Sequence, residues 1–177
     1  MSAETPMLKQ YWAIKRQHRD KILLFRLGDF YETFFDDAEI ASRALEITLT
    51  AREAKGEKYP MAGFPCHAAD TYIARLVNKG YKVAICEQVE DPRRASGLVE
   101  REVVRIVTPG TLTDPGMLEE KEYNFLAAIT FQQSDGKYGL AYADVSTGTF
   151  LMTEFGDSRG LLDEVLKVAP RECLLEQ

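Results

Sequence analysis

The stretch from Leu27 to Phe35 concentrates the residues whose types and spacing could do chemistry. It reads Leu-Gly-Asp-Phe-Tyr-Glu-Thr-Phe-Phe, so a turn signal is followed by a run of aromatic residues with one acid, Glu32, among them. If the run is a strand, Phe30 and Glu32 project from the same face; if it is a helix, they stand about 200° apart. A large apolar ring beside a carboxylate on one face suits a binding surface better than a core.

An exposed Phe30 could act as a wedge between stacked bases, which unstacks one step of a duplex and kinks it. A weakly paired site lowers that cost, so a wedge would discriminate by deformability rather than by a base code. Glu32 could donate to a purine N7 when protonated, or accept from a base N–H when ionised. The alternative is that Phe30 belongs to the core and Glu32 is a solvated charge at a strand edge.

Composition places limits on the class of protein. The 177 residues carry a net charge of −6, which argues weakly against a nucleic-acid binder. Cys66, Cys86 and Cys173 are odd in number and outside any C-x-x-C pattern, so we expect reduced thiols and no metal site. There is no signal-peptide pattern and no apolar run of about 20 residues, so we expect a cytoplasmic protein with no membrane partner.

Two other functions remain open on the residues alone. Asp144 ends a predicted strand before Ser-Thr-Gly, where a carboxylate could serve metal-dependent phosphoryl transfer. The partners that such a site needs are not identifiable in the residues that follow, and Asp144 also suits the start of a turn. The aromatic surface could alternatively make the chain a protein-interaction module.

The elements that must position Phe30 and Glu32 follow from hydrophobic periodicity and turn signals. We predict an α/β fold with a mixed β-sheet flanked by helices, followed by a truncated α/β domain. Helices are expected from Pro6 with Thr5 as N-cap, from Asp36-Asp37 as caps to Leu45, over 67–79, and after Ser158 as a cap. Strands are expected at 22–27, 30–35, 47–50, 81–89, 103–107, 126–131, 138–145, 149–153 and from 173, with an extended segment at 59–65, a charged loop at 52–58 and a linker at 116–123.

Four motifs in order along the chain resemble the MutS family of DNA mismatch repair proteins. They are Gly28 to Glu32, similar to the family's Phe-x-Glu signature, then Pro60 to Pro65, Ala84 to Gln88, and Arg105 to Thr111. The likeness runs from about Thr5 to Gly148. It implies that residues 1–115 are a mismatch-recognition domain and that 124–177 begin a connector domain, ribonuclease-H-like and incomplete.

The resemblance also implies roles for individual residues and for partners. Phe30 would stack on a mispaired or unpaired base from the minor groove, and Glu32 would hydrogen-bond that base. Leu27, Met61 and Gly63 would lie beside the same contact, and Arg52 and Arg101 match basic positions near the duplex. The expected partner is mismatched double-stranded DNA, with no catalytic residue, metal or cofactor in this segment. ATP, Mg²⁺, dimerisation and MutL would belong to the full-length protein.

Overall fold

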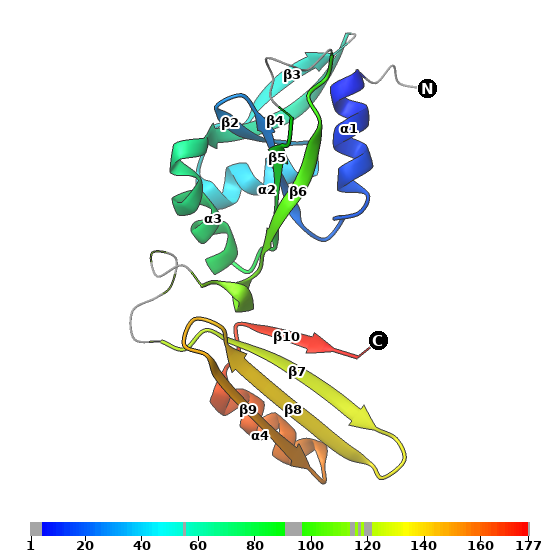
Figure 1. Cartoon of the computed structure of the whole chain (residues 1–177), viewed down its shortest axis with the longest axis vertical. Helices are drawn as coiled ribbons and strands as arrows, with labels where there is room; N and C mark the ends of the chain where they lie inside the picture. The colour runs from blue at the N-terminus through cyan, green and yellow to red at the C-terminus, as the bar shows by residue number, and fades with distance from the viewer. Residues whose placement is uncertain are drawn as a thin grey trace. The chain divides into compact units, whose positions relative to one another are not determined.

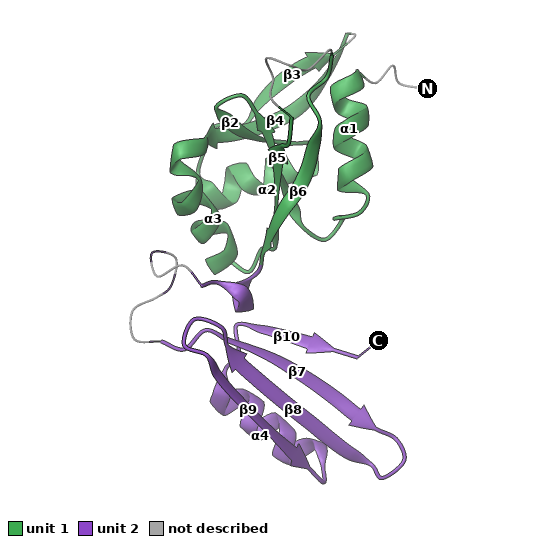
Figure 2. Cartoon of the chain, viewed as in Figure 1, with its two compact units in different colours: residues 1–107 green, residues 108–177 purple. Residues whose placement is uncertain are grey.

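A computed structural model of the chain describes residues 5–54, 56–90, 97–113, 116, 118 and 122–176. The chain divides into two compact units, residues 1–107 and 108–177, which are coloured separately in Figure 2. Residues 117 and 119–121 of the predicted linker lie outside the described residues.

The first unit is built on a six-stranded mixed sheet with the strand order β3-β4-β2-β1-β5-β6 (Figure 1). β1 is antiparallel to β2 and parallel to β5, so the sheet is mixed as predicted. Its elements are α1 (Pro6–Lys15), β1 (Ile22–Leu27), β2 (Phe30–Phe34), α2 (Asp36–Leu45), β3 (Thr50–Ala54), β4 (Glu57–Pro65), η1 (Cys66–Ala68), α3 (Ala69–Asn78), β5 (Val83–Gln88) and β6 (Arg101–Val107).

Helices cover both faces of this sheet. On one face, Tyr11 of α1 packs edge-on against Phe25 and Phe34, at 5.7 and 5.1 Å between ring centroids. These three rings belong to the hydrophobic core between α1 and the sheet. On the other face, Tyr72 of α3 stacks on Phe64 at 4.5 Å, and α2 contacts α3, β2 and β4. Thr5 caps α1 as predicted, because its side-chain oxygen accepts a hydrogen bond from the Leu8 N–H.

The prediction for residues 47–58 is wrong. The predicted strand 47–50 and the loop 52–58 are replaced by the antiparallel hairpin β3–β4. Ile47 instead closes α2, since its N–H donates to the Ser42 carbonyl after Glu46 adopts a left-handed conformation. The charged residues of β3 are compatible with a strand because β3 is an exposed edge of the sheet.

Asp37 was expected to cap α2, and that expectation is also wrong. No side-chain cap bond is made at the start of α2, and Asp37 is buried. Its carboxylate accepts hydrogen bonds from the Leu23 N–H at 3.0 Å and from Lys15 Nζ at 2.9 Å. The acid therefore joins α1, β1 and α2, which fixes the helix against the strand that leads into the Leu27–Phe35 stretch.

In its described residues, the second unit contains a four-stranded sheet with the order β10-β7-β8-β9 and the helix α4. The predicted antiparallel meander is present, and β10 returns parallel to β7. Leu161 of α4 packs on Ala127 and Leu140. The N-cap of α4 is Asp157, whose side chain accepts from the Gly160 N–H, rather than the predicted Ser158. The elements are η2 (Pro109–Thr111), β7 (Phe125–Gln132), β8 (Lys137–Asp144), β9 (Thr149–Phe155), α4 (Ser158–Val168) and β10 (Glu172–Leu175).

The two mixed sheets and their helices confirm the predicted α/β class. Within the described part of the chain, no helix has both the length and the apolar character needed to cross a membrane.

Candidate functional site

Phe30 and Glu32 share one face of the sheet, because the stretch is a strand and not a helix. The β1–β2 hairpin pairs Leu27 with Phe30 and Phe25 with Glu32. Gly28 has φ of +60° and is the only one of the two turn residues with a positive φ, which suits a type II′ hairpin turn. Side chains alternate along β2, so Tyr31 points to the opposite face and is buried there.

The aromatic run divides into a buried part and an exposed part. Phe34 is fully buried under Tyr11, and the Phe35 ring packs against Trp12 at 4.8 Å. Phe30, at the other end of β2, keeps 46% of its surface exposed. The core on the α1 face therefore stops short of Phe30 and leaves an aromatic ring in solvent beside the hairpin turn.

Glu32 is held by an ion pair with Arg52 across the sheet. Arg52 Nη1 lies 3.0 Å from Glu32 Oε2, with 15% of the Glu32 side chain and 45% of the Arg52 side chain exposed. Burial raises the pKa of Glu32 above its ordinary value, and the charge and hydrogen bond of Arg52 oppose that rise. The carboxyl group of Glu32 therefore keeps its proton to a higher pH than an exposed glutamate does.

Gly63 makes room for this ion pair. It lies opposite Glu32 in the β2–β4 ladder, and a Cβ at this position would meet the Tyr31 carbonyl oxygen at 2.8 Å and Glu32 Cγ at 3.3 Å. The absence of a side chain lets Glu32 lean over β4 toward Arg52 on β3.

Leu27 and Met61 lie on the same face, at the two ends of β2. Both are partly buried against the core under α1, with Leu27 opposite Phe30 and Met61 opposite Phe34. The structure thus brings together six of the seven predicted site residues. They are Leu27, Phe30, Glu32, Arg52, Met61 and Gly63.

The seventh, Arg101, is not part of this exposed group. It is only 6% exposed, and its guanidinium donates to the Arg26 carbonyl at 2.7 Å and to Gln10 Oε1 at 2.9 Å. It also lies 5.0 Å from the centroid of the Phe25 ring. This geometry makes Arg101 an internal support for β1 rather than a side chain available to a phosphate.

A polar network behind Phe30 was missed from the sequence. On the face opposite Phe30, Arg26 Nη1 lies 3.3 Å from Glu87 Oε2, and the Tyr31 hydroxyl donates to Glu87 Oε1. The sequence signal for this network was one charged residue near the end of each of two otherwise apolar strands, Arg26 in β1 and Glu87 in β5.

The geometry of Asp144 fits a turn and not a phosphoryl-transfer site. Its buried carboxylate accepts hydrogen bonds from the Asn124 N–H at 3.0 Å, from the Ser146 N–H at 2.9 Å and from the Ser146 hydroxyl at 2.6 Å. Burial raises the pKa of Asp144, but these bonds and one from the Thr147 N–H outweigh burial and lower it. No group of three or more metal-ligating side chains occurs among the residues that the structure describes.

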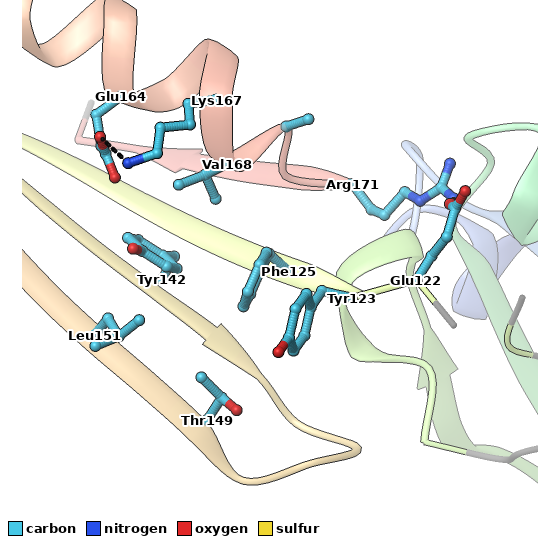
Figure 3. A pocket seen from close by; sticks show the side chains of 11 residues that line it. Glu122, Tyr123, Phe125, Tyr142, Thr149, Leu151, Glu164, Lys167, Val168 and Arg171 are labelled. Atoms are coloured by element: carbon cyan, nitrogen blue, oxygen red, sulfur yellow. Dashed lines mark hydrogen bonds and ion pairs between the residues drawn. The ribbon is translucent and has the colours of Figure 1, made fainter. Parts of the chain in front are cut away.

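A pocket of about 620 Å³ in the second unit lies beside the C-terminal end of α4 (Figure 3). Its aromatic wall comes from Tyr123, Phe125 and Tyr142, with Tyr123 and Phe125 stacked at 4.9 Å. Two of its basic groups are paired with acids, Lys167 with Glu164 at 3.3 Å and Arg171 with Glu122 at 2.7 Å. Since those charges are engaged within the protein, the pocket offers no clear anion site.

Comparison with known proteins assigns the chain to a family. The family model for MutS domain I matches residues 5–116, and the model for MutS domain II matches residues 124–177. The DNA mismatch repair protein MutS of Desulforamulus reducens is 58% identical over 98% of this chain, and those of Staphylococcus saprophyticus and Ruminiclostridium cellulolyticum are 53% and 56% identical over 100% and 99%. The chain spans about 20% of the length of each of these relatives. The chain therefore belongs to the MutS family and matches its domains I and II.

Proposed function

We propose that this chain is the part of a mismatch repair protein that detects mispaired DNA. Phe30 enters from the minor groove and stacks on a mispaired or unpaired base, and Glu32 hydrogen-bonds that base. The observation that carries the proposal is the exposed ring of Phe30 on the same face as the Glu32 carboxylate.

The energetic basis of discrimination is the cost of opening the duplex. Inserting an apolar wedge costs a few kcal/mol per unstacked step and kinks the DNA. A mismatched or unpaired base has already lost part of its pairing and stacking energy, so the same insertion costs less there. Phe30 requires no rearrangement of the core to act in this way, because its ring is already in solvent.

The neighbours of Phe30 have distinct roles in this proposal. Arg52 neutralises the charge of Glu32 near the duplex, Leu27 lines the contact beside Phe30, and Met61 lies farther along the same face, opposite Phe34. Gly63 keeps the Glu32 side chain in place. Arg101 is left out of the contact with DNA because its guanidinium is bound inside the unit.

The rest of the proposal concerns the longer protein. We assign residues 1–115 to mismatch recognition, 116–123 to a linker and 124–177 to the start of a connector domain. With a net charge of −6, this chain alone should bind DNA weakly, so most general affinity must come from other parts of a longer protein. ATP and Mg²⁺ binding, dimerisation and contact with MutL belong to those parts, in the cytoplasm, and this segment has no catalytic role.

The test uses a chimaera in which this chain replaces the matching segment of the Desulforamulus reducens relative. A duplex with a G·T mismatch carries donor and acceptor dyes at its ends, so that kinking raises energy transfer. We expect the chimaera to raise the energy transfer in the mismatched duplex. With the Phe30→Ala variant, the energy transfer in that duplex should stay near the value for the matched duplex. Phe131→Ala is the matched control, because Phe131 is also 46% exposed but lies in the second unit. Equal kinking by the Phe30→Ala and Phe131→Ala variants would reject the wedge.

A further inference from the structure

The face of the hairpin opposite Phe30 carries a connected set of polar side chains on three adjacent strands. Tyr31 on β2 and Arg26 on β1 are cross-strand partners, and Glu87 lies on β5 next to β1. Glu87 accepts from the Tyr31 hydroxyl through one oxygen and pairs with Arg26 at 3.3 Å through the other. The Arg26 guanidinium also lies 5.6 Å from the centroid of the Tyr31 ring. We call these three residues the hairpin clamp.

The hairpin clamp reaches the turn itself. Arg26 Nε donates to the Gly28 carbonyl at 2.6 Å, so the same guanidinium that binds Glu87 also holds the first residue of the turn. The second turn residue is held separately, because the Cys66 N–H donates to the Asp29 carbonyl at 2.8 Å. These contacts bind both turn carbonyls to the body of the unit.

A wedge needs this kind of support. The ring of Phe30 must resist the tendency of the bases to restack, and a hairpin end that flexed would yield before the bases did. Short hairpins are marginally stable by themselves, so rigidity at the turn has to come from contacts with neighbouring elements. Burial, followed by the hydrogen bond to Glu87, raises the pKa of Tyr31, so its hydroxyl remains a donor at neutral pH.

We propose that Arg26, Glu87 and Tyr31 are positioning residues for Phe30, which hold the Gly28-Asp29 turn rigid so that the aromatic ring can unstack a base. None of the three touches the DNA in this arrangement, because their side chains lie on the face opposite Phe30. The proposal rests on the proposed function for its role in sensing, whereas the rigidity of the turn can be measured without DNA.

The first measurement is amide hydrogen exchange by NMR on the 177-residue chain. The Cys66 amide reports opening of the turn, because it donates to Asp29, and the Ile22 amide, which donates to the Lys82 carbonyl at 2.8 Å, reports the far end of β1. We expect Tyr31→Phe to speed Cys66 exchange by about tenfold, the effect of losing one charge-assisted hydrogen bond. Arg26→Gln removes the contacts with both Gly28 and Glu87, so we expect at least the same acceleration, with Ile22 unchanged in both variants. Tyr72→Phe is the control, because its ring stacks on Phe64 in the same unit. Unchanged Cys66 exchange in both variants, or equal acceleration at Ile22, would overturn the proposal.

The second measurement is the ratio of mismatched to matched duplex affinity in the chimaera. We expect Tyr31→Phe to lower this ratio while the affinity for matched duplex stays constant, which a general loss of folding would not produce. Faster Cys66 exchange with an unchanged ratio would overturn the positioning role, even where Phe30→Ala abolishes the preference. If Phe30→Ala itself leaves the preference intact, the proposed function fails, and faster Cys66 exchange then shows a structural role only.

Discussion

Replacing Glu32 with Gln separates the two duties of its carboxylate, which are to pair with Arg52 and to meet a base. Arg52 is 45% exposed, and exposed ion pairs contribute about 0.2 to 1 kcal/mol. Burial raises the pKa of Glu32, so ionisation of this acid costs stability and the substitution removes that cost. These opposed effects lead us to expect a change of less than about 1 kcal/mol in the free energy of unfolding.

The same substitution should change how the protein binds matched DNA. Without the charge of Glu32, which lies 3.0 Å from Arg52 in the native chain, the Arg52 guanidinium is no longer neutralised and becomes available to one phosphate. One added phosphate contact steepens the dependence of log K on log salt by about 0.9. The gain in matched-duplex affinity should therefore be about 3.5-fold larger at about 50 mM than at about 200 mM salt. Preference for a mismatch should fall, because the carboxylate that meets the base is gone.

Fluorescence anisotropy on the chimaera measures both effects, with matched and G·T duplexes over a range of salt concentrations. Glu53→Gln is the control, because it removes the same charge from β3, where Glu53 is the cross-strand neighbour of Lys58. An equal gain in matched-duplex affinity in the Glu53→Gln variant would mean that the gain comes from the change in net charge and not from Arg52. An unchanged salt slope or a weaker matched-duplex affinity in Glu32→Gln would refute the claim that Arg52, once the charge of Glu32 is removed, binds a phosphate.

Three further predictions concern stability. Asp37→Ala should cost about 3 to 5 kcal/mol in urea unfolding, because it leaves the partly buried Lys15 ammonium without its carboxylate at 2.9 Å. Gly63→Ala should cost about 1 to 3 kcal/mol in thermal unfolding, since its Cβ would meet the Tyr31 carbonyl oxygen at 2.8 Å, and an unaltered melting temperature would contradict this contact. For pH, the raised pKa of Glu32 means that the folded protein holds this proton to higher pH than the unfolded chain does. The stability of Glu32→Gln relative to the native chain should thus increase as pH rises past the ordinary Glu pKa of about 4.3, and a constant difference in urea midpoints would exclude the shift.

The parts of the fold that the sequence predicted well are those where local signals agree with burial. Gly28-Asp29 between two runs of β-forming residues predicted the hairpin, and the hairpin places Phe30 and Glu32 on one face. Thr5 as N-cap and Pro6 at the first helical position predicted where α1 begins. In these cases the contacts that decide the structure lie close together in the chain.

The errors arose where distant partners decide the outcome. The charged residues of β3 resemble a loop until β4 pairs with them, and Asp37 resembles a cap until Lys15 and the Leu23 N–H reach it. Arg101 was expected near the duplex, and neither its bond to the Arg26 carbonyl nor its bond to Gln10 of α1 can be deduced from the residues next to it in the sequence. Six of the site residues nevertheless lie on one face, because they belong to four adjacent strands of the same sheet, β3, β4, β2 and β1.

The most direct measurement compares the affinities of three chimaeras, the native form, Phe30→Ala and Phe131→Ala, for a G·T duplex and for the matched duplex of the same sequence. We predict that Phe30→Ala binds the two duplexes with equal Kd, while Phe131→Ala, which truncates an equally exposed ring, keeps the native preference. A Phe30→Ala chimaera that still prefers the G·T duplex as strongly as the native form would contradict the assignment of Phe30 as the mismatch probe.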